Sequence, residues 1–131
     1  MASFNNLEMA QALSHDSRVT IKKGFLGFGA KVVYQPTQSP IHVMLREYNA
    51  DNGARMENLI NAPADRLEAE VEKGKDIQDA QIGSMHLEAC ISRDRQFVAL
   101  QMFHFVDFKY KPVTPLRIFE GNEAQLVSSL F

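Results

Sequence analysis

The sequence predicts one α+β domain over residues 1–131, with a mainly antiparallel sheet of about five or six strands, an N-terminal helix, a middle helical segment and a C-terminal helix. Strand-like segments cluster along the chain instead of alternating strictly with helices, which favours an antiparallel sheet over a doubly wound parallel one. A hairpin pattern runs from Gly83 to Tyr110. A length of 131 residues is ordinary for one domain and allows a core that needs no metal or disulfide.

The N-terminal half is expected to hold one helix followed by strands. The helix is expected between Ser3 and Ser14, with Ser3 as its N-cap. The apolar residues at helical spacing in this segment are Phe4, Leu7, Ala10 and Leu13. Alternation of apolar and polar residues then predicts strands at Val19–Ile21, Val32–Tyr34 and Ile41–Tyr48.

A glycine-rich stretch, Gly24–Gly29, lies between the first two of these strands and has the spacing G-x-x-G-x-G. Dinucleotide-binding loops have the order G-x-G-x-x-G before a helix, and phosphate-binding P-loops end in Lys-Ser or Lys-Thr. This stretch has neither feature, and β-type residues follow it. We therefore expect a bulged or twisted strand pair here, and no nucleotide or other cofactor.

The middle segment interrupts the β pattern. Turn-forming residues at Asn49–Gly53 predict a break in the chain. A short helix is expected around Met56–Ile60, and a second helix from Ala64 to Lys73. The second helix carries many charges and little apolar area, so we expect it to lie on the solvated surface.

The C-terminal half holds the strongest β signal. Apolar and polar residues alternate over Met85–Ser92, and Phe97–Tyr110 is a long apolar run that is expected to be bent or bulged. Leu116–Phe119 is expected to form one more short strand. Asn122 is the expected N-cap of a final helix, with Gln125 as its capping-box partner.

A candidate polar site depends on how the two strands of the hairpin pair. With a three-residue loop centred on Arg95, His86 lies opposite His104, and Glu88 shares their face. Two imidazoles and a carboxylate suit a divalent metal, with His86 and His104 as ligands, or acid–base catalysis near neutral pH. A shift of one residue places the two histidines on opposite faces. The alternative to a site is a solvated or interface face that carries His86 and Glu88.

Cys90 is the one cysteine of the chain, so no disulfide can form within it. A nucleophilic role requires His86 or His104 beside it, whereas free cysteines are commonly buried, so we expect a structural thiol. The sequence shows no signal-peptide pattern and no apolar segment of membrane-spanning length. These features favour a cytoplasmic protein that is not embedded in a membrane.

The charge of the chain argues against a nucleic-acid partner. Lys and Arg number 14 and Asp and Glu number 16, which gives a formal net charge of −2, and the basic residues are scattered. Nucleic-acid binders concentrate positive charge on one face because phosphate contacts supply most of their affinity. We therefore expect no nucleic-acid binding.

The expected function follows from the hairpin, which is apolar on both faces and needs cover on both. Since helices are few, a subunit interface is expected to cover one face, most simply in a two-fold homodimer. We expect a non-enzymatic binding or accessory protein that self-associates through its sheet and binds a protein partner or a small ligand. The alternative is a small metal-dependent or acid–base enzyme that uses His86, Glu88 and His104.

A third possibility is a pocket for a small ligand between the sheet and the helix Ser3–Ser14. The order of elements does not select among these functions. It occurs in small dimeric secretion chaperones, in cystatin-like domains and elsewhere, and a shared fold does not imply a shared function.

Overall fold

The structure is a computed structural model that describes residues 7–22, 31–75 and 85–131. Its helices are α1 (Leu7–Ser14), α2 (Ala50–Asn61), the short 3₁₀ helix η2 (Ala64–Arg66), α3 (Leu67–Gly74) and α4 (Gly121–Ser128). Its strands are β1 (Val19–Lys22), β2 (Lys31–Tyr34), β3 (Ser39–Tyr48), β4 (Met85–Ser92), β5 (Phe97–Val106), β6 (Lys109–Pro112) and β7 (Arg117–Glu120). Within these ranges, no helix is both long and apolar enough to cross a membrane. The predictions for Ser3 and for Gly24–Gly29 lie outside the described residues.

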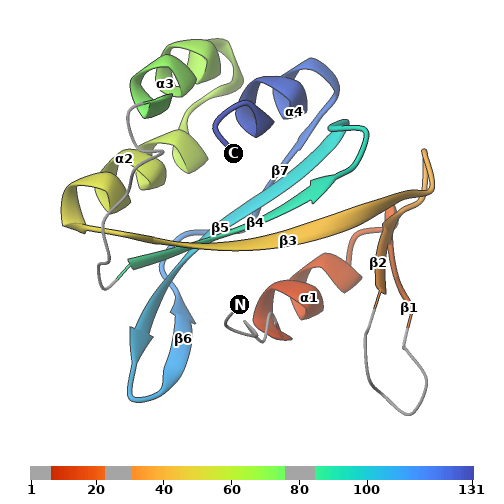
Figure 1. The fold of residues 1–131 in the computed structure, drawn as a ribbon, viewed down its shortest axis with the longest axis horizontal. Coiled ribbons are helices and arrows are strands. Elements are labelled where there is room, and N and C mark those ends of the chain that lie inside the picture. Colours follow the sequence, from red (N-terminus) through yellow and green to blue (C-terminus); the bar gives the residue numbers. More distant parts are fainter. Residues whose placement is uncertain (1–6, 23–30, 76–84) are drawn as a thin grey trace.

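The seven strands form one antiparallel sheet in the order β1-β2-β3-β4-β5-β6, and β7 pairs with the opposite end of β5 from β6. This confirms the predicted α+β class with N-terminal, middle and C-terminal helices. The sheet curls, with α1 against its hollow side and α2, α3 and α4 on the opposite side (Figure 1).

Each face of the sheet has its own apolar core. On the side of α2, α3 and α4 the buried side chains include Tyr48, Met56, Leu87, Leu100 and Phe119. On the side of α1 the buried residues are Met9, Leu13, Val19, Tyr34, Cys90, Phe97, Ala99 and Phe103. Helices of the same chain therefore cover both faces of the β4–β5 hairpin, so its two apolar faces do not by themselves require a second subunit.

Helix α2 begins six residues earlier than the predicted helix at Met56, because Asn49 caps it. The side-chain oxygen of Asn49 accepts a hydrogen bond from the amide of Asn52 at 2.9 Å, which satisfies one of the free amides of the first turn. Gly53, predicted to lie in a turn, is a buried residue of this helix. A Cβ at Gly53 would lie 3.2 Å from Cβ of Met85, so the glycine lets α2 pack closely on β4.

The segment predicted as a helix from Ala64 forms η2 and then α3. The expectation that this helix lies on the solvated surface is wrong in part. Leu67 and Val71 are fully buried in the apolar core between the sheet and the helices α2, α3 and α4. Two apolar residues four positions apart are enough to fix one face of a two-turn helix.

The β4–β5 hairpin turns through four residues, Arg93–Gln96, and not through the expected three. The hydroxyl of Ser92 accepts a hydrogen bond from the amide of Phe97 at 3.0 Å. The same hydroxyl donates to the carboxylate of Asp94 at 2.7 Å. Arg95 has a φ of 57°, a left-handed conformation that helps the loop return to the strand. The additional loop residue shifts the predicted register by one.

The apolar run Phe97–Tyr110 forms two strands and not one bent strand, because the chain reverses at Asp107 and Phe108 between β5 and β6. Strand β7 confirms the short strand predicted at Leu116–Phe119, one residue further along the chain. The predicted cap of the last helix is wrong, because the N-cap of α4 is Glu120 and not Asn122.

A polar network joins the β1–β2 hairpin to β7. The carboxylate of Glu120 accepts a hydrogen bond from the hydroxyl of Tyr34 and forms an ion pair with Arg18 at 2.5 Å. Arg18 also binds Asp16 at 2.6 Å. Burial and the bond to Glu120 raise the pKa of Tyr34 to about 12. The network therefore links the β1–β2 hairpin directly to the end of β7.

Candidate functional site

The structure separates the two histidines of the predicted site. His86 lies opposite Phe103 on β5, whereas His104 lies opposite Met85, so the predicted pairing of His86 with His104 is wrong. Neighbouring residues of a strand point to opposite faces, which places His86 on the α1 side and His104 on the side of α2. Across residues 7–22, 31–75 and 85–131, no group of three His, Cys, Asp or Glu side chains is arranged to hold a metal ion.

His86 is buried in an aromatic environment. Its ring makes edge contacts with Tyr110, at 5.2 Å between centroids, and with Phe105, at 6.1 Å. Its Nδ1 lies 3.7 Å from the Oε1 atom of Glu47 on β3. Burial lowers the pKa of His86 below its usual value, Glu47 acts in the opposite direction, and His104 lowers it further. The neutral imidazole is therefore favoured.

Glu88 lies two residues beyond His86 on the same face of β4 and is fully buried. It lies opposite Gln101 of β5, which is only 7 % exposed. The Nε2 atom of Gln101 donates to the carbonyl oxygen of Thr114 at 3.2 Å. His86, Glu88 and Gln101 thus form a row of buried polar side chains on the hollow side of the sheet. The described residues provide the predicted His86–Glu88 proximity but not the second histidine.

Cys90 lies further along the same face of β4 and is buried against α1. Its Sγ atom lies 3.8 Å from the Sδ atom of Met9. Burial raises the pKa of the Cys90 thiol strongly, and the charge of Glu88 adds to this effect. A thiol in this state is a poor nucleophile, which supports the structural role expected from the sequence.

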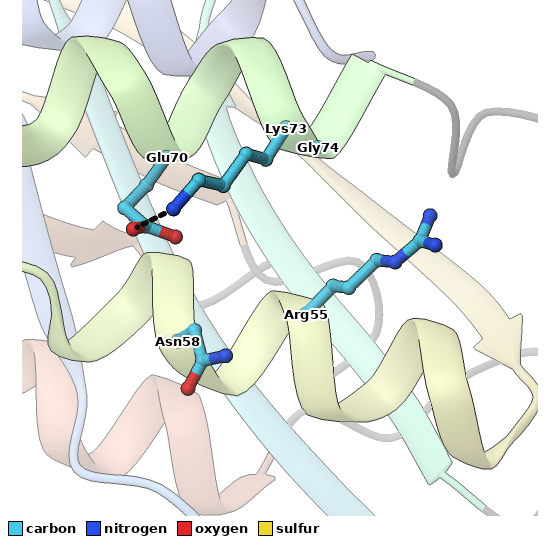
Figure 2. Close-up of a pocket in the computed structure, with 5 residues that line it drawn as sticks. All are labelled: Arg55, Asn58, Glu70, Lys73 and Gly74. Atoms are coloured by element: carbon cyan, nitrogen blue, oxygen red, sulfur yellow. Dashed lines mark hydrogen bonds and ion pairs between the residues drawn. The ribbon is translucent and has the colours of Figure 1, made fainter.

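Two hollows lined entirely by described residues lie away from this polar row. One, of about 380 Å³, lies between α2 and α3 and is lined by Arg55, Asn58, Glu70, Lys73 and Gly74. Lys73 forms an ion pair with Glu70 at 3.0 Å within α3, while Arg55 extends away from both (Figure 2). The lining therefore carries two cations and one carboxylate, and Lys73 and Glu70 compensate each other, which leaves the positive charge of Arg55. A single exposed charge of this kind gives at most a weak preference for an anion.

The second hollow, of about 410 Å³, lies on the outer side of the β1–β2 hairpin. Its lining residues are Thr20, Lys22, Val33, Gln35 and Gln38. None of the predicted site residues His86, Glu88 and His104 lines either hollow.

Within the part of the chain that the structure describes, one side of β3 has no partner strand over most of its length. β2 pairs with β3 only at Ser39 and Pro40, whereas β4 pairs with Ile41–Tyr48 on the other side. The amide of Arg93 donates to the carbonyl of Pro40 at 3.1 Å, so Pro40 and every second residue after it direct their backbone groups toward β4.

The intervening residues of β3 direct their amides and carbonyls outward. These residues are Ile41, Val43, Leu45 and Glu47. We call the open side of Ile41–Glu47 the β3 edge; among the described strands, none pairs with it.

The β3 edge lacks the features that usually protect an exposed strand. The opposite edge of the sheet, β6, has four residues and carries Lys109, Lys111 and Pro112, which hinder pairing with another chain. The centre of the β3 edge is apolar, and the side chain of Val43 is 38 % exposed. An exposed apolar strand of this kind is a template for strand addition.

A second unusual surface is the β5–β6 tip, formed by Asp107 and Phe108 with Phe105 and Tyr110 beside it. Asp107 has a φ of 52° and Phe108 a φ of 61°, so both central residues of this two-residue turn are left-handed, as in a type I′ turn. Phe108 is 95 % exposed, and Phe105 is 42 % exposed and lies 4.8 Å from the ring of Tyr110. Glycine is the usual residue at the second position of such a turn, so Phe108 is strained as well as solvated.

Comparison with protein-family models, with curated proteins and with solved structures found no match for this chain. The two unusual surfaces were not found from the sequence. The β3 edge has no sequence signal, because it depends on which strands pair. The β5–β6 tip has one weak signal, the short polar interruption at Asp107 within the apolar run.

Proposed function

We propose that this chain is a non-enzymatic binding or accessory protein that self-associates through its sheet. The observation that supports this is the β3 edge, an apolar strand where Val43, Leu45 and Glu47 direct outward backbone groups that no other described strand pairs with. Pairing with another strand satisfies these groups, and each hydrogen bond contributes about 1 kcal/mol net. Strand addition also covers the exposed part of Val43.

The β5–β6 tip is the surface we assign to a partner. The side chain of Phe108 does not contribute to the packing of the core, because it is 95 % exposed. The backbone of Phe108 is also in the left-handed conformation, which is unfavourable for this residue. Strained and exposed apolar residues cluster at contact sites, where partner binding uses the side chain. A partner protein with an apolar pocket would accommodate the protruding ring of Phe108, and the half-exposed ring of Phe105 would add to the contact area.

The alternative, a small metal-dependent or acid–base enzyme, is less well supported than a binding protein. It required His86 and His104 on one face with Glu88, whereas the register places His104 on the other face. His86 with Glu47 and Glu88 remains, and supports a buried polar row.

Sedimentation velocity at micromolar concentration tests self-association. The wild-type chain, of 14.8 kDa, is expected to sediment at twice its own mass. Val43→Lys places a charge on the β3 edge and is expected to give a monomer, because strand pairing buries that side chain. Val113→Lys is the matched control, since Val113 is similarly exposed, at 42 % against 38 %, but lies outside β3. A wild-type monomer at all concentrations, or equal dimerisation of both variants, contradicts the proposal.

A further inference from the structure

We propose that the strand which pairs with the β3 edge is β3 of a second copy, running antiparallel about a two-fold axis at Met44. This inference rests on the proposed self-association and specifies its register. The open stretch is bounded by Pro40, where β2 pairs, and by Tyr48, where β3 ends. Its seven residues, Ile41–Glu47, have Met44 as their midpoint. A two-fold axis at the midpoint pairs the whole stretch, whereas any other centre leaves outward-directed groups unpaired.

The direction of the backbone groups agrees with this register. In an antiparallel pair, residues that direct their amides and carbonyls outward must face residues that do the same. A centre at Met44 places Val43 opposite Leu45 of the second copy, and both are outward-directed residues of the β3 edge. The pair occurs twice by symmetry, so four apolar side chains come together on the α1 side of the joined sheet.

The charges of the strand also fit this register. Arg46 and Glu47 are the charged residues of the open stretch. A centre at Met44 places Glu47 opposite Ile41 and Arg46 opposite His42, so neither charge faces its own copy. The Nε2 atom of His42 accepts a hydrogen bond from Arg93 at 2.9 Å, which requires the unprotonated nitrogen. A centre at Arg46, by contrast, places two guanidinium groups directly opposite each other, which is unfavourable.

Cysteine cross-linking measures the register directly. Met44 directs its backbone toward β4, so Met44 and its symmetry copy form a non-hydrogen-bonded pair with Cα atoms about 4.5 Å apart. This distance lies within the range of about 4.4–6.8 Å that a disulfide spans. Under mild oxidation, Met44→Cys is expected to convert most of the chain to a covalent dimer on a non-reducing gel. Wild type is the control for background reaction, since its Cys90 is buried.

Two further variants keep the test decisive if Met44→Cys disturbs folding. Val43→Cys and Leu45→Cys are expected not to cross-link alone, because each lies about 7–8 Å from its own copy, on a diagonal. An equimolar mixture of the two is expected to cross-link, because Val43 faces Leu45.

Cross-linking of Leu45→Cys alone, or of Val43→Cys alone, overturns the register at Met44 and leaves self-association intact. A dimer in sedimentation without any of these cross-links overturns the β3 pairing. A wild-type monomer overturns both this inference and the proposed function.

Discussion

The guanidinium of Arg117, on β7, donates from Nη1 to the carbonyl oxygen of Ile60 at 2.8 Å and also binds the carbonyl of Ala62. These two carbonyls lie where α2 ends, and they lack partners within the helix. Arg117 therefore joins the C-terminal end of α2 to the far strand of the sheet. It also places a positive charge at the negative end of the helix dipole.

Replacing Arg117 by methionine is expected to lower the free energy of unfolding by about 2 kcal/mol. The change keeps an apolar stem of similar length but leaves two carbonyls without their charged donor. Urea unfolding followed by circular dichroism measures the effect. Arg117→Lys, which keeps one donor, is the control and is expected to lose less. An unchanged unfolding midpoint in Arg117→Met contradicts this role.

Replacing Phe108 by glycine is expected to raise the free energy of unfolding by about 0.5–1 kcal/mol. Glycine adopts the left-handed conformation at φ 61° without strain, and the exposed ring contributes no core packing. The same change at Lys109, a strand residue of β6, serves as the control and is expected to destabilise the protein. A loss of stability in Phe108→Gly shows that the ring is needed for folding, which removes the reason to assign it to a partner.

His86 is expected to make stability depend on pH. Burial holds the pKa of folded His86 below its usual value of 6.5, so the unfolded chain binds more protons as the pH falls below that value. The contribution of His86 is fully present above about pH 6.5 and is lost as the pH falls toward the folded pKa. Urea midpoints between pH 5 and 8 measure this slope. His86→Gln is expected to flatten this slope, and His15→Gln, at an exposed position, serves as the control for replacing a histidine.

The strands could be predicted from the sequence where one pattern repeats clearly. Met85–Ser92 and Ile41–Tyr48 alternate, and both lie within strands. The sequence predicts a helix shorter than α2, because Asn49 and Gly53 are turn formers in isolation. Their actual roles as a cap and as a close contact with Met85 depend on the helix and sheet around them.

The register of the hairpin could not be predicted, because β5 offers no alternation to fix it. Phe97 to Leu100 is apolar at every position and fully buried, so either register places apolar side chains on both faces. The register is set by the loop between the two strands. The hydrogen bonds of Ser92 to Asp94 and Phe97 stabilise a loop of four residues instead of three. That single residue separates His86 from His104 and so removes the pairing on which the predicted metal site is based.

Residue-resolved amide hydrogen exchange of the wild-type chain tests strand pairing at the β3 edge most directly. The amides of Met44 and Arg46 face β4 and are protected in any folded state, which makes them internal controls. If the β3 edge pairs with another strand, the amides of Val43, Leu45 and Glu47 are equally protected at high protein concentration and exchange faster on dilution. Rapid exchange of these three amides at every concentration, with Met44 and Arg46 still protected, contradicts self-association through β3.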